Sequence, residues 1–140
     1  MAIHIIAKDI LLKIINESVP FSLALKQSFK HNNVSKEEKP VVSAIVGCAL
    51  RHYLVMEKLI KDSYPNLESE AFVALLIAFS NALFIKKIDQ EECNNYAQSF
   101  LKEEDAKIED FLKPYLEGQK LVPEDIELRV LRGVFAGRDR

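Results

Sequence analysis

The sequence predicts an all-α protein, built as a bundle of six or seven helices around one buried central helix. Apolar residues recur at helical spacing in most segments, and no segment shows the strict alternation of a half-buried strand. With only four Gly and five Pro among 140 residues, long loops should be few. A chain of this length usually forms one domain. We therefore expect a single helical domain over residues 1–133 and a frayed tail over 134–140.

The first helix is predicted to begin near Ile3, because Ile3, Ile6 and Ile10 lie on one face. Ile5 and Leu12 fall outside that stripe and among polar neighbours. Exposed apolar side chains of this kind can mark a protein–protein contact. Ile5 and Leu12 are therefore candidates for a partner surface.

Further helices are expected over about residues 22–31, 38–62, 67–87, 90–102, 105–117 and 123–132. Ser35 and Glu38 form a capping box before the third helix, and Asp89 and Glu92 form a second one. The third helix should be long, since its apolar stripe continues to Ile60. The fourth is apolar on every side in its middle and should be the buried central helix.

The third helix also contains an internal glycine, Gly47, followed one turn later by Arg51. A glycine inside a helix costs about 1 kcal/mol relative to alanine, so it is expected to serve a purpose. Close approach of a neighbouring helix is the purpose we predict for Gly47. Arg51 would then reach out beside that contact.

The formal net charge of −2 argues against a strongly basic nucleic-acid binder. Residues 1–64 nevertheless carry a net charge of +3 and residues 65–140 a net charge of −5. A polyanion is therefore expected to meet the first half of the chain. Basic residues spread along helices are also found on ordinary solvated surfaces, and composition alone leaves that reading open.

No motif predicts catalysis, a metal site or a cofactor. The three histidines lie on different predicted helices, and there is no Gly-rich turn to hold a phosphate. The acidic residues beside Cys93 should raise its pKa and oppose reactivity, and Cys48 is expected to be inert as well. There is no signal peptide, and the longest apolar run, 71–79, is too short to cross a bilayer. A cytoplasmic protein without a membrane contact is the default.

Several segments together resemble the NusB-like RNA-binding fold. The pattern is carried by residues 7–12, 19–25, 39–51, 73–85 and 89–97, and it extends over residues 2–102. Gly47 followed by Arg51 is its most informative part. This fold occurs as the free transcription antitermination factor NusB and as the N-terminal domain of ribosomal RNA cytosine-C5 methyltransferases of the RsmB type.

The resemblance implies a non-catalytic module that binds RNA, either a ribosomal RNA or a nascent transcript, and acts with a partner. Arg51 and His52 are the candidates for close contact with the RNA, and further contacts with phosphates are expected from Lys8, Lys13, Lys39 and Lys58. An N-terminal domain fragment of a methyltransferase is the first alternative. That enzyme would need a Gly-rich cofactor loop and a Cys after Pro, and this chain has neither. A protein-interaction or homodimerisation scaffold without RNA is the second.

Overall fold

The computed structural model describes residues 2–122, and within that range every regular element is a helix. The expected all-α class is thus confirmed. The elements in chain order are α1 (Ile3–Glu17), α2 (Phe21–His31), α3 (Glu38–Arg51), α4 (Tyr53–Ser63), α5 (Ser69–Ser80), the π-helix η1 (Asn81–Ile85), α6 (Gln90–Gln98) and α7 (Ile108–Leu116). The helix predicted after Pro123 and the tail over 134–140 lie outside the described residues.

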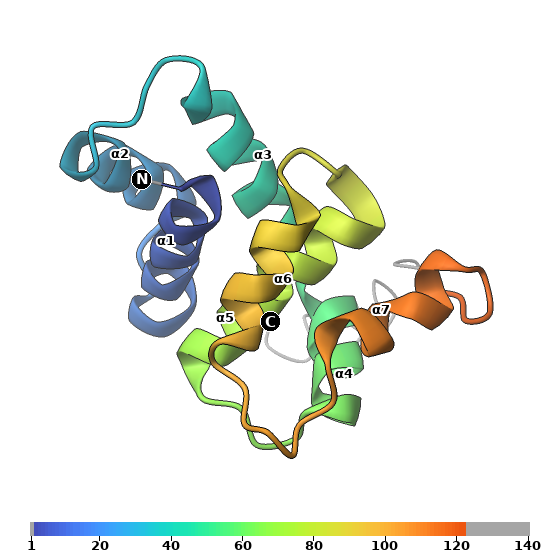
Figure 1. Ribbon diagram of the computed structural model, residues 1–140. Coiled ribbons are helices and arrows are strands. Elements are labelled where there is room, and N and C mark those ends of the chain that lie inside the picture. Colours follow the sequence, from blue (N-terminus) through green and yellow to red (C-terminus); the bar gives the residue numbers. More distant parts are fainter. Residues whose placement is uncertain (1, 123–140) are drawn as a thin grey trace, which may run out of the picture.

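Helix α5 is the buried centre of the bundle, as its sequence predicts. All ten residues from Ala71 to Ser80 are buried, and α5 packs against α1, α3, α4 and α6 (Figure 1). Helix α2 packs mainly on α1, and α7 packs on α6 and η1. The ring of Phe111 in α7 stacks on Phe79 of α5 with centroids 4.7 Å apart. The core therefore lies around α5, and the other helices are held by their contacts with this layer.

The long third helix of the prediction is two helices. α3 ends at Arg51, α4 begins at Tyr53, and their axes are bent by 72° at His52. His52 leaves the α-helical region, with φ −103° and ψ 17°. The bend lets each half bury its own part of the apolar stripe against α5, for example Ile45 in α3 and Met56 in α4.

The central helix also ends differently from the prediction, which extended it to about residue 87. The α-helical hydrogen bonding stops at Ser80, a π-helix follows, and Lys86 takes the left-handed conformation with φ 48°. Asn81 explains this ending. Its Oδ1 accepts hydrogen bonds from the backbone N–H groups of Lys87 and Ile88, and its Nδ2 donates to Ile88 O and Gln90 Oε1. A buried side chain thus supplies partners that helical backbone would otherwise have supplied.

The helix-end signals are largely confirmed. Ser35 and Glu38 exchange two hydrogen bonds of 3.1 and 3.2 Å as a capping box, and Asp89 accepts from the N–H of Glu92. The last two described helices are shorter than expected. α6 ends at Gln98, and α7 begins only at Ile108, because Asp105 caps the intervening loop through the N–H of Lys102.

Candidate nucleic-acid interface

Arg51 and His52 lie at the bend between α3 and α4, where one is exposed and the other half-buried. The imidazole of His52 stacks on the ring of Phe84 from η1, with centroids 3.8 Å apart and planes 7° from parallel. Phe84 keeps 36% of its surface exposed despite this cover. The bend and the π-helix therefore join in an aromatic pair at the surface, with the Arg51 guanidinium on the adjacent residue.

Two lysines follow this aromatic pair directly. Lys86 and Lys87 are both exposed, and the backbone that carries them is fixed by the four hydrogen bonds of Asn81. π-Helical segments often occur at functional sites. The hydrogen-bonded turn places two cations close in sequence to Phe84 without relying on a flexible loop.

Sequence reasoning missed Phe84, Lys86 and Lys87. One signal was available: Ser80 and Asn81 interrupt an apolar helix, and a buried asparagine needs several partners. That signal predicts a local break before the lysine pair. It does not predict that Phe84 meets His52, because the contact joins segments more than thirty residues apart.

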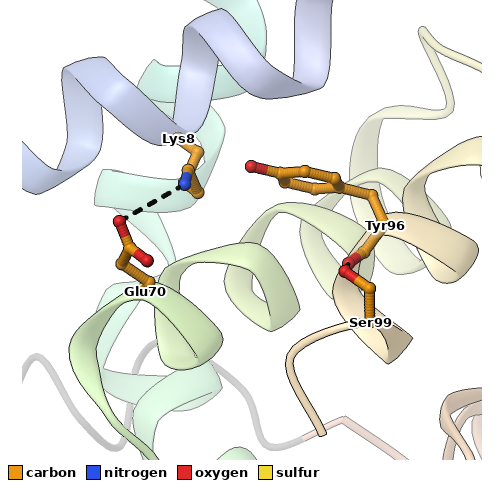
Figure 2. A network of polar contacts seen from close by, with 4 residues as sticks. All are labelled: Lys8, Glu70, Tyr96 and Ser99. Carbon is orange, nitrogen blue, oxygen red and sulfur yellow. Dashed lines mark hydrogen bonds and ion pairs between the residues drawn. The ribbon is translucent and has the colours of Figure 1, made fainter.

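Lys8 occupies a different environment from the phosphate-contacting one that we predicted (Figure 2). Its side chain is only 12% exposed, and its Nζ lies 3.7 Å from Glu70 Oε1 and 5.1 Å from the Phe100 ring centroid. Partial burial alone would lower the pKa of Lys8, but contacts with Tyr96, Glu70 and Asp9 outweigh it and raise the pKa. Lys8 therefore joins α1 to α5 and α6, and little of its ammonium remains for a phosphate.

The other predicted phosphate contacts do not form one patch with Arg51. Lys39 lies at the start of α3, with its Nζ 5.9 Å from the Phe29 ring centroid, and is about 18 Å from Arg51 along the helix at 1.5 Å per residue. Lys58 is exposed on α4, and Lys13 is half-buried on α1. The structure thus brings together Arg51 and His52 from the predicted set and leaves the lysines dispersed.

Gly47 does not have the role that we predicted. An ideal Cβ built on it would find, among the described residues, only Nη2 of Arg51 within 4 Å, at 4.0 Å. No helix approaches closely there. Helical side chains point towards the N-terminus of their helix, so Arg51 lies over the preceding turn that contains Gly47. The pairing of these residues in the sequence reflects a contact within α3.

The candidate partner surface at Ile5 and Leu12 is less open than expected. Both side chains are half-buried, and Leu12 packs against the core. The large apolar side chains that are exposed in the described range are elsewhere, at Phe21, Leu23, Leu54, Phe84, Leu116 and Leu121. A partner contact at Ile5 and Leu12 remains a prediction.

The cysteines sit in unreactive surroundings. Both are buried, and burial, followed by the charges of Asp89 and Glu92, raises the pKa of the Cys93 thiol to about 12. This agrees with the expected effect of its acidic neighbours, although burial is the larger cause. Residues 2–122 contain no group of three or more His, Cys, Asp or Glu side chains that could hold a metal ion.

In the described range no single helix is long and apolar enough to cross a membrane. α3 and α4 meet the length and hydropathy criteria only as a pair, and they are sharply bent. Comparison of the chain with protein-family models, curated proteins and solved structures finds no match.

Proposed function

We propose that this chain is a non-catalytic RNA-binding module of the NusB-like type, acting on ribosomal or nascent RNA together with a partner. The observation that carries the proposal is the surface formed by Arg51, the His52–Phe84 ring pair, Lys86 and Lys87, which we call the bend surface. The resemblance of residues 2–102 to the NusB-like fold supports the same reading. The N-terminal domain of an RNA methyltransferase would use this surface in the same way.

The chemistry of the bend surface suits a phosphate backbone with accessible bases. Arg51 offers a planar guanidinium that can bind a phosphate with two parallel hydrogen bonds. Lys86 and Lys87 add two point charges on an ordered turn. Exposed aromatic rings next to such cations are surfaces on which RNA bases stack. The combination allows positioning through phosphates without any catalytic group.

The experiment is a fluorescence polarisation titration of a labelled, unstructured twelve-nucleotide RNA at 50 to 200 mM salt. If the three cations neutralise three phosphates, log K should fall with log salt with a slope of about −2. Arg51→Ala should weaken binding by about tenfold or more, since a charge-assisted hydrogen bond contributes about 1.5–3 kcal/mol. The double variant of Lys86 and Lys87 to alanine should flatten the salt dependence.

Lys102→Ala is the matched control, because Lys102 is an exposed lysine in the loop between α6 and α7. It should bind RNA like the parent. Circular dichroism would confirm that every variant keeps its helices. If the bend-surface variants bind RNA as tightly as Lys102→Ala does, the proposal is wrong and a protein-interaction role becomes the better reading.

A further inference from the structure

A second site lies at the other end of α5 from the bend surface. A cavity of about 260 Å³ opens where the end of α1, one face of α4 and the first turn of α5 meet. We call it the α4 pocket. The side chains that matter for its chemistry are Ile15, Tyr53, Glu57, Lys61, Leu67 and Phe72. Its volume equals that of about nine liquid water molecules, at about 30 Å³ each, so it suits a ligand with about eight non-hydrogen atoms.

One wall of the α4 pocket is a polar row. Tyr53, Glu57 and Lys61 follow one another at intervals of four residues and therefore share a face of α4. The Tyr53 hydroxyl donates to Glu57 Oε2 at 3.1 Å, and Lys61 Nζ lies 3.4 Å from the same oxygen. Burial and the Glu57 carboxylate raise the pKa of Tyr53 to about 12, so the hydroxyl keeps the proton that it donates.

The second carboxylate oxygen of Glu57 is the unusual feature. Both contacts of Glu57 use Oε2, and within residues 2–122 no hydrogen-bond or ion-pair partner of Oε1 is found. The side chain is 31% exposed, so the carboxylate is accessible from the cavity. The Lys61 side chain is 63% exposed, and such a surface ion pair is weak enough to rearrange.

The opposite wall of the α4 pocket is apolar. Phe72 meets Tyr53 edge to face, with ring centroids 5.9 Å apart, and Leu67 and Ile15 extend this wall. Aromatic rings beside a carboxylate favour a cation, since the faces of the rings carry negative charge. An anion would meet the Glu57 carboxylate. A neutral apolar molecule would remove water from Oε1 without replacing its hydrogen bonds, which costs binding free energy.

We propose that the α4 pocket binds a small organic cation, namely a primary ammonium group attached to a compact apolar body. The ammonium group donates to Glu57 Oε1, and the apolar body lies against Phe72, Leu67 and Ile15. The inference does not depend on RNA binding, because the pocket shares no residue with the bend surface. The α5 helix separates the two sites.

The test is an NMR titration of the ¹H–¹⁵N spectrum with three probes of the same shape and different charge: benzylammonium, benzyl alcohol and benzoate. Benzylammonium should cause saturable shifts in α4 and the first turn of α5, with a dissociation constant on the order of 1 mM. Benzyl alcohol should bind at least tenfold more weakly, and benzoate should cause no saturable shift. Absence of saturable shifts with benzylammonium, or equal binding of benzyl alcohol, would overturn the proposal.

Two variants locate the charge that is recognised. Glu57→Gln keeps an acceptor for Tyr53 but loses the negative charge, and it should bind benzylammonium at least tenfold more weakly. Lys61→Met removes the competing cation and should bind it at least as tightly as the parent. Glu37→Gln and Lys58→Met are the matched controls, both at positions that do not line the pocket, and neither should change binding. Unchanged binding by Glu57→Gln would refute recognition by this carboxylate. If that variant does not fold, the comparison of the three probes on the parent protein decides alone.

Discussion

Replacing Gly47 by alanine should stabilise the protein. A glycine inside a helix costs about 1 kcal/mol relative to alanine, because it loses more backbone freedom on folding. The new Cβ would meet only Arg51 Nη2, at 4.0 Å, which is an ordinary van der Waals contact, so no clash offsets the gain. We expect the free energy of unfolding to rise by about 0.5–1 kcal/mol and the melting temperature by about 2–5 °C.

Urea denaturation followed by circular dichroism at 222 nm measures this change, and the dependence on urea concentration should stay the same. Gly118→Ala is the matched control. A Cβ there also meets no described atom within 4 Å, but the residue has φ +76°, where a side chain is strained. That variant should lose about 1 kcal/mol. A loss of stability in Gly47→Ala would mean that a close neighbour fills the space beside it, and the reasoning about Arg51 would fail.

Three further outcomes are expected. Asn81→Ala should lower the free energy of unfolding by about 2–4 kcal/mol in the same urea assay, because it leaves buried backbone groups near Lys87 without partners; a loss below 0.5 kcal/mol would contradict this role. Burial lowers the pKa of His4 below 6.5 despite the nearby Glu92 carboxylate, so the unfolded chain binds the proton more readily and stability should fall as the pH drops below 6.5; in His4→Leu this part of the pH dependence should vanish. Ser35→Ala removes the side chain that accepts from the Glu38 N–H and should cost about 1 kcal/mol by thermal unfolding, whereas no change would show that the capping box contributes nothing.

The sequence predicts those parts of the fold that depend on local chemistry. The apolar surround of α5, the capping box at Ser35 and Glu38, and the break before α2 each arise from residues close together in the chain. The bend at His52 is different. The apolar stripe runs without interruption from α3 into α4, so periodicity alone favours one straight helix, and only packing of both halves against α5 requires the bend.

The candidate site shows the same division. Arg51 and His52 were recognisable as neighbours on one helix, but the partner ring of Phe84 comes from a segment that tertiary packing brings to them. Lys8 shows the opposite error. Its charge suggested a surface role, whereas the ring of Phe100 and the carboxylate of Glu70 enclose it between helices. Charge in a sequence does not reveal which lysines are already paired.

The π-helix after α5 has a consequence for how this chain tolerates insertions and deletions. One residue of an α-helix corresponds to a rotation of about 100°, so a π-turn changes the angular phase of everything that follows it. The direction in which Phe84 and the two lysines after it project is set by this phase. Removing a single residue between Asn81 and Ile85 would turn these side chains by roughly a quarter of a circle, although every amino acid that forms the surface would still be present. The length of this segment is therefore under a tighter geometric constraint than the identity of most of its residues.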